Sequence, residues 1–67
     1  MKTIDGPNGL FVRVEQNDMI RWMGRPFEWG LFRRVMGLTV RIDHGYAETV
    51  EDAERHARIF MEREAMP

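Results

Sequence analysis

His44 and His56 are the residues of this 67-residue sequence best suited to acid–base or metal chemistry. Asp43 precedes His44, so these three side chains would form a cluster if the fold brought residue 56 back to residue 44. Their spacing matches no metal-ligand motif, because such motifs place their ligands at short, fixed separations. A histidine at a strand end and a histidine on a helix face explain both residues equally well. We therefore expect no catalytic residue, no metal site and no cofactor.

The usual covalent nucleophiles are missing from the sequence, which contains neither cysteine nor serine. Their absence excludes hydrolases with an activated serine or thiol, and it excludes disulfides and thiolate metal sites. The single lysine, Lys2, lies at the second position, where a Schiff-base or phosphate-binding lysine is not expected. The composition therefore predicts a protein that is not an enzyme.

Four carboxylates crowd one short segment: Glu48, Glu51, Asp52 and Glu54. They would suit docking on a basic surface, or imitation of the spaced phosphates of a nucleic acid. A simpler explanation is that the dipole of a helix favours acids at its start. Residues 1–47 carry seven basic and five acidic residues, whereas residues 48–67 carry three basic and six acidic ones. The net charge of −1 argues against a basic nucleic-acid clamp.

Arginines and aromatic residues are interleaved in the middle of the chain: Arg21, Arg25, Arg33, Arg34 and Arg41 lie among Trp22, Phe27, Trp29 and Phe32. This mixture is typical of single-strand nucleic-acid binding, of protein interfaces, and of an aromatic core with arginines at its rim. A small core is nearly filled by Val12, Val14, Ile20, Trp22, Val40, Ile42, Phe60 and Met61. The large apolar residues beyond this core are expected to be exposed or buried against another chain. They are Met19, Met23, Phe27, Trp29, Phe32 and Met36.

Alternating polar and apolar residues predict strands at 10–15, 19–23 and 38–46, with Leu38, Val40 and Ile42 on one face and a bulge or bend at Gly45. Residues 1–8 are expected to be a lead-in with little regular structure, because residues 5–9 are turn formers. Residues 27–37 have two interpretations. Helical spacing, Pro26 at the start and Gly37 at the end favour a short helix or an irregular aromatic loop. Gly30 is unfavourable inside a helix, and the aromatic residues favour a strand.

A long helix is expected over residues 49–65. Thr49 is a suitable N-cap, and acids follow it in the first turn. An apolar stripe with helical spacing consists of Val50, Ala53, Ala57, Phe60 and Met61. Opposite charges four residues apart add support at Glu51–Arg55, Glu54–Arg58 and Arg58–Glu62.

These elements predict an α+β fold, in which a small antiparallel three-stranded sheet packs against the C-terminal helix, with a possible short helix between the second and third strands. One domain comprises residues 1–67, with the lead-in at 1–8, the sheet region at 9–47 and the helix at 49–65. The sheet face away from the helix would carry Phe11, Arg13, Arg21 and Arg41. This open face and the two sheet edges are the places where a partner would bind.

The junction His44-Gly45-Tyr46-Ala47-Glu48-Thr49-Val50-Glu51-Asp52-Ala53-Glu54 resembles that of many small phage and prophage proteins. The similarity covers residues 38–58 and is a pattern of fold rather than a functional motif. Among such proteins, anti-CRISPR proteins are similar in size, in lacking cysteine and in lacking catalytic residues. The resemblance implies a compact, non-enzymatic binder of an effector complex, with an acidic surface directed at a nucleic-acid channel.

We therefore predict a non-enzymatic protein-binding module, specifically a phage-encoded inhibitor that blocks a nucleic-acid-binding surface of a bacterial CRISPR effector complex. The predicted partner-binding residues are Glu48, Glu51, Asp52, Glu54, Trp29, Phe32, Arg33 and Arg34. The alternatives are a small nucleic-acid-binding protein that uses an arginine and aromatic sheet face, and a homo-oligomeric accessory protein. We expect a cytoplasmic monomer or homodimer without a small-molecule substrate or a membrane partner, since no stretch is apolar enough to span a bilayer.

Overall fold

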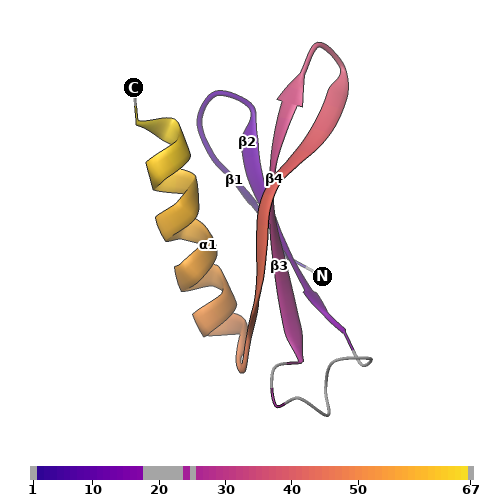
Figure 1. Ribbon diagram of the computed structural model, residues 1–67, viewed down its shortest axis with the longest axis vertical. Coiled ribbons are helices and arrows are strands. Elements are labelled where there is room, and N and C mark those ends of the chain that lie inside the picture. Colours follow the sequence, from indigo (N-terminus) through magenta and orange to yellow (C-terminus); the bar gives the residue numbers. More distant parts are fainter. Residues whose placement is uncertain (1, 18–23, 25, 67) are drawn as a thin grey trace.

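The computed structural model describes residues 2–17, 24 and 26–66. Its strands are β1 (Lys2–Asp5), β2 (Leu10–Gln16), β3 (Phe27–Val35) and β4 (Leu38–Ala47), and its helix is α1 (Val50–Ala65). The strands form one antiparallel sheet in the order β1-β2-β3-β4, and α1 lies along one face of it (Figure 1). The α+β class is confirmed. The prediction of a three-stranded sheet is wrong, because the described part of the chain contains four strands.

Strands β3 and β1 were not in the predicted sheet, and β1 lies in the segment expected to be a lead-in. It pairs with β2 in a hairpin that places Ile4 opposite Val12. The turn formers of residues 5–9 close this hairpin, since the Gly6 N–H donates to the Leu10 carbonyl at 2.8 Å. Asn8 and Gly9 have positive φ angles of 58° and 79°, a conformation that asparagine and glycine tolerate best. The residues that indicated a turn in the sequence therefore form the turn of the β1–β2 hairpin.

Residues 27–35, for which helix and strand remained open, form strand β3. It pairs with β2 on one side and with β4 on the other, so the backbone groups of β3 are hydrogen-bonded to neighbouring strands on both sides. Trp29 and Leu31 are buried on the side of α1. Gly37 does not cap a helix. With Met36 it forms the tight turn between β3 and β4, in which both residues have positive φ angles.

Strand β4 confirms the prediction of a strand at 38–46. Its irregularity lies not at Gly45 but opposite Leu31 and Phe32, where Ile42 is the extra residue on β4. Gly45 has a different role, because a Cβ atom there would lie 2.7 Å from the Trp29 indole. The expectation that Val40 belongs to the core is wrong, since its side chain is exposed.

Helix α1 confirms the predicted C-terminal helix and its cap. The Asp52 N–H donates to Thr49 Oγ1 at 3.1 Å, an interaction that contributes about 1 kcal/mol in helix N-caps. Ala53, Ala57 and Met61 are buried against the sheet.

The core lies between α1 and one sheet face. It consists of Leu10, Val12, Val14, Trp29, Leu31, Ala47, Ala53, Ala57 and Met61. Trp29 is central, since only 3% of it is exposed and its indole stacks on Phe60 with centroids 5.3 Å apart. Trp29 is therefore not surplus to the core. The predicted strand at 19–23, with the core candidates Ile20 and Trp22, lies outside the described residues.

Candidate functional site

The acidic residues predicted to bind a partner gather at the start of α1, but two of them already have cationic partners. Asp52 binds Arg55 at 2.7 Å, and Glu54 binds Lys2 of β1 at 2.6 Å. Glu48 and Glu51 are exposed and form no ion pair within the described residues. The cluster therefore offers less free negative charge than its composition indicates.

The aromatic and basic residues predicted to bind a partner do not form one surface. Alternation along β3 places Trp29 and Arg33 on the side of α1, whereas Phe32 and Arg34 lie on the open face. Trp29 is buried, so a partner cannot reach it. Arg33 is half-buried, and its Nε has no hydrogen-bond partner in the described part of the chain.

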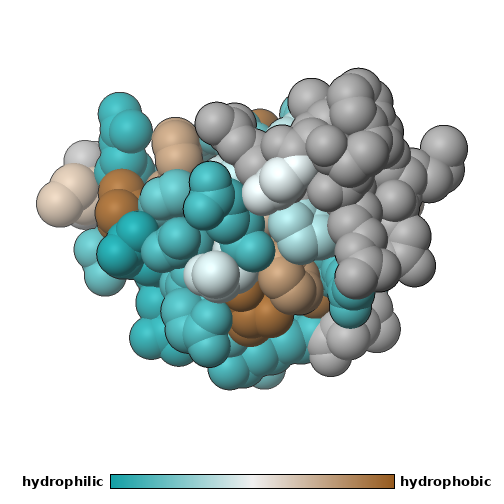
Figure 2. Space-filling view, turned by 90° about the horizontal axis from the view of Figure 1, so that it is seen from below, coloured by the Kyte–Doolittle hydropathy of each residue, from teal (hydrophilic) through white to brown (hydrophobic). Residues whose placement is uncertain are grey.

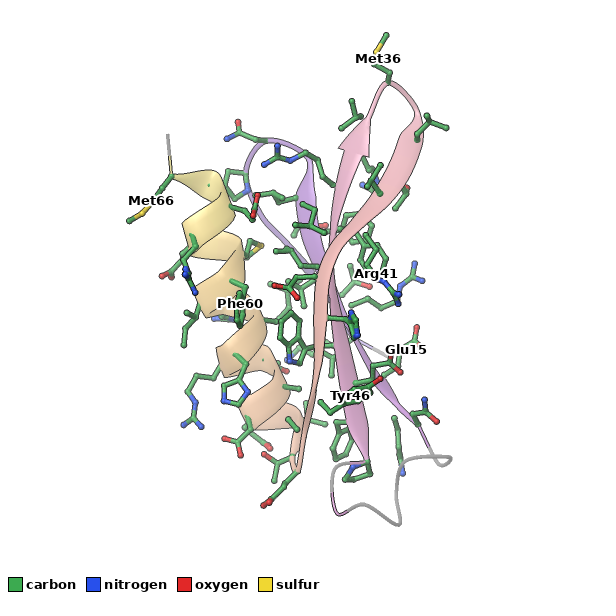
Figure 3. The ribbon with its side chains drawn as sticks, viewed as in Figure 1. Glu15, Met36, Arg41, Tyr46, Phe60 and Met66 are labelled. Carbon is green, nitrogen blue, oxygen red and sulfur yellow. The ribbon has the colours of Figure 1, made fainter. Side chains whose placement is uncertain are left out.

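The open face carries a small second layer of packing. Phe11 of β2 stacks on Phe32 of β3, with ring centroids 5.1 Å apart. The Arg34 guanidinium lies 4.5 Å from the centre of the Phe11 ring, and that of Arg13 lies 5.6 Å from the centre of the Phe32 ring. Figure 3 shows Arg41, Glu15 and Tyr46 on this side of the sheet, away from α1. The arginines thus cover the aromatic rings, which would have to be uncovered before a nucleobase could stack on them.

A shallow hollow of about 150 Å³ lies on the same face, lined by Arg13, Glu15, Glu28, Gly30, Phe32 and Arg41. Its two glutamates face each other directly across β2 and β3. Like charges opposite one another in a sheet destabilise it, and here they also oppose the binding of an anion. The hollow is therefore a poor phosphate site.

The most exposed apolar surface lies at the β3–β4 turn, which projects away from the body of the molecule (Figures 1 and 3). Its residues are Val35, Met36, Leu38 and Val40, with exposed fractions of 45%, 98%, 69% and 51%. We call these four residues the arm. Val35 pairs with Leu38, and Val40 pairs with Arg33. Cross-strand partners share a face, so Val35, Leu38 and Val40 continue the core-facing side of the sheet beyond the helix.

The arm is exposed because β4 is longer than the helix that follows it. Ten strand residues extend about 33 Å, whereas the sixteen residues of α1 extend about 24 Å. The sequence pattern predicts Val40 in the core and, of the arm residues, only Met36 as surplus. Comparison of the length of the alternating segment 38–46 with the length of the helix would have indicated that the start of this strand extends beyond the helix.

A second hollow lies where β4 passes into α1. It has a volume of about 320 Å³ and is lined by Tyr46, Ala47, Glu48, Asp52 and His56. We call it the junction hollow. Tyr46 and Ala47 supply its less polar lining, and Glu48, Asp52 and His56 supply its polar lining. Figure 2 views the molecule from the end where α1 begins, and shows a mostly hydrophilic face around a small hydrophobic area.

Two further observations on the described residues concern clusters of metal-ligating side chains and membrane-spanning helices. No group of three or more histidine, cysteine, aspartate or glutamate side chains within residues 2–17, 24 and 26–66 is arranged to hold a metal ion. The Asp43 carboxylate instead accepts the N–H of His44 at 2.8 Å, and the His44 ring meets Tyr46 edge-on. Over the same residues, no helix has the length and apolar character needed to cross a membrane.

Comparison with known proteins identifies no relative: no family model, no curated protein and no solved structure matches this chain.

Proposed function

We propose that this chain is a non-enzymatic protein-binding module that docks through the arm. The observation that carries the proposal is the run of four exposed apolar side chains on a projecting hairpin. Contiguous apolar surface of this kind is unfavourable in water and marks interaction sites in small soluble domains. The arm is a paired hairpin rather than a free loop, since the β3–β4 ladder continues to Val35 and Leu38, and this lowers the entropy lost on binding.

A bacterial CRISPR effector complex is the specific target class within this proposal. Its support is the resemblance of residues 38–58 to small phage proteins, together with the exposed carboxylates of Glu48 and Glu51. The docking surface differs from the predicted one, because Trp29 is buried while Leu38 and Val40 are exposed. In this proposal the arm provides the apolar contact, and the two free glutamates add charge complementarity with a basic groove.

The experiment compares the wild-type protein with Leu38→Glu, which places a charge in the arm. The matched control is Ile59→Glu, since Ile59 is 48% exposed on the outer side of α1 and has Arg55 and Arg63 four residues away. Each immobilised protein is incubated with a bacterial lysate and with a purified CRISPR effector, and bound proteins are quantified. We expect the control to retain the wild-type partners and Leu38→Glu to retain less than a tenth of them. Equal retention by both variants would exclude the arm as the docking surface.

A nucleic-acid-binding protein is the second candidate function, because arginines stack on aromatic rings on the open face. Glu15 and Glu28 on that face oppose phosphate binding. We therefore expect no appreciable binding of short single- or double-stranded oligonucleotides at near-physiological salt in a fluorescence anisotropy titration. Binding that weakens steeply with salt would contradict this expectation, since steep salt dependence is the mark of phosphate contacts. Loss of that binding in Arg41→Glu would locate it on the open face.

A further inference from the structure

We infer that the arm binds a second copy of this chain, in a two-fold dimer formed along β4. This inference rests on the proposed function, because it concerns the same docking surface; a second copy and an effector would compete for the arm. It starts from the two edges of the sheet, β1 with four residues and β4 with ten. Residues 38–40 of β4 carry no charge and no proline, so this part of the edge lacks the usual devices that prevent strand pairing. The middle of the edge is different, because it contains the extra residue Ile42 and the Asp43 carboxylate bound to the His44 N–H.

In an antiparallel pairing of two β4 strands, the two ends of each strand form hydrogen bonds with the other copy. The irregular middle of β4, around Ile42 and Asp43, lies on the two-fold axis. Residues 38–40 of each copy then run beside residues 45–47 of the other. A two-fold axis of this kind is perpendicular to the sheet, so both helices lie on the same face. Leu38 and Val40, which face that side, come to the end of β4 where the partner's helix begins. That end contains the junction hollow, so each arm meets a concavity on the other copy.

Charge favours the same arrangement. The base of the arm carries Arg33, which faces the side of α1, and the junction hollow has Glu48 at its edge, with exposed Glu51 nearby. The antiparallel pairing brings the basic end of each copy to the acidic end of the other, and the two-fold axis makes this contact twice. The net charge of −1 per chain causes little repulsion between copies.

The first test is the molar mass in solution, measured by light scattering and by sedimentation over a range of concentrations. We expect twice the 8.0 kDa mass of one chain for the wild-type protein and for Ile59→Glu. Leu38→Glu should raise the dimer dissociation constant at least tenfold while its circular dichroism spectrum remains that of a folded protein. A wild-type monomer at high concentration, or a Leu38→Glu dimer of unchanged affinity, would overturn the inference. Neither result affects the capture experiment above, so failure of the dimer is separable from failure of the protein-binding function.

The second test reports whether the two β4 strands pair antiparallel, by engineered disulfide crosslinking. Because the chain contains no cysteine, any disulfide must come from the introduced residues. In the proposed pairing Thr39 lies opposite Tyr46 of the partner subunit, and both side chains are exposed. Directly opposed residues in an antiparallel pair have Cα atoms about 4.5–5.5 Å apart, which suits a disulfide. The double variant Thr39→Cys with Tyr46→Cys should therefore form a disulfide-linked dimer under mild oxidation. The control pairs Thr39→Cys with Arg58→Cys on the helix and should form far less. Equal crosslinking of the two double variants would overturn the antiparallel arrangement.

Discussion

Ala57→Glu is expected to unfold this domain. Ala57 has no exposed surface and lies on the side of α1 that packs against the sheet, next to Ala53 one turn earlier. A glutamate there would be larger than the available space and would bury a carboxylate among apolar side chains, a change that costs several kcal/mol. The total stability of small domains is about 5 kcal/mol, so little folded protein should remain. Thermal melting followed by far-ultraviolet circular dichroism measures the effect.

The control for this prediction is Ile59→Glu, which introduces the same side chain two residues further along the same helix. Ile59 is half-exposed, and Arg55 and Arg63 lie one turn away on either side. We expect its melting temperature to stay within a few degrees of the wild-type value, because exposed substitutions usually change stability by only about 0.5 kcal/mol. A cooperative wild-type melting curve for Ala57→Glu would show that α1 does not pack on the sheet through this face.

Trp29→Ala is expected to be the most damaging truncation in the core. The indole is almost fully buried, stacks on Phe60 of α1 and fills the space left by the missing side chain of Gly45 on β4. Removal of a buried tryptophan leaves a large cavity and costs about 3–5 kcal/mol. Urea denaturation followed by circular dichroism should show a midpoint shifted to much lower concentration, or no folded baseline.

Tyr46→Ala is the matched control, since Tyr46 is an aromatic residue of β4 that is 43% exposed. Its truncation should cost much less than that of Trp29, because it opens no cavity. Equal midpoints for Trp29→Ala and the wild-type protein would contradict the position of Trp29 in the core. This comparison also explains why Trp29→Ala cannot test partner binding, as it would remove the folded state on which binding depends.

Helix α1 could be predicted from the sequence because its signals are local. The Thr49 cap, the acids after it and the apolar stripe through Ala53 and Ala57 all act within a few residues. The alternation in β2 and β4 was equally clear, because successive side chains of a strand point to opposite faces and the apolar residues repeat at every second position. The α+β class followed from these elements.

Strands β1 and β3 could not be predicted from the sequence, because both form through pairing with strands elsewhere in the chain. Strand propensity reflects packing against neighbours more than a preference of the backbone itself, so a four-residue strand such as Lys2–Asp5 has almost no signal of its own. In residues 27–35 the local helical spacing was outweighed by ladders to β2 and β4 on both sides, which only the folded chain supplies.

The candidate site shows the same division between sequence and tertiary structure. Composition identified an acidic helix start and a surplus of large apolar residues, both of which are properties of the sequence alone. Which of those residues face water depended on how far α1 reaches over the sheet. Because the helix is shorter than β4, Leu38 and Val40 are left exposed, whereas the absence of a side chain at Gly45 lets Trp29 enter the core. Burial is a property of the packed layers, so residue type and spacing could not assign it.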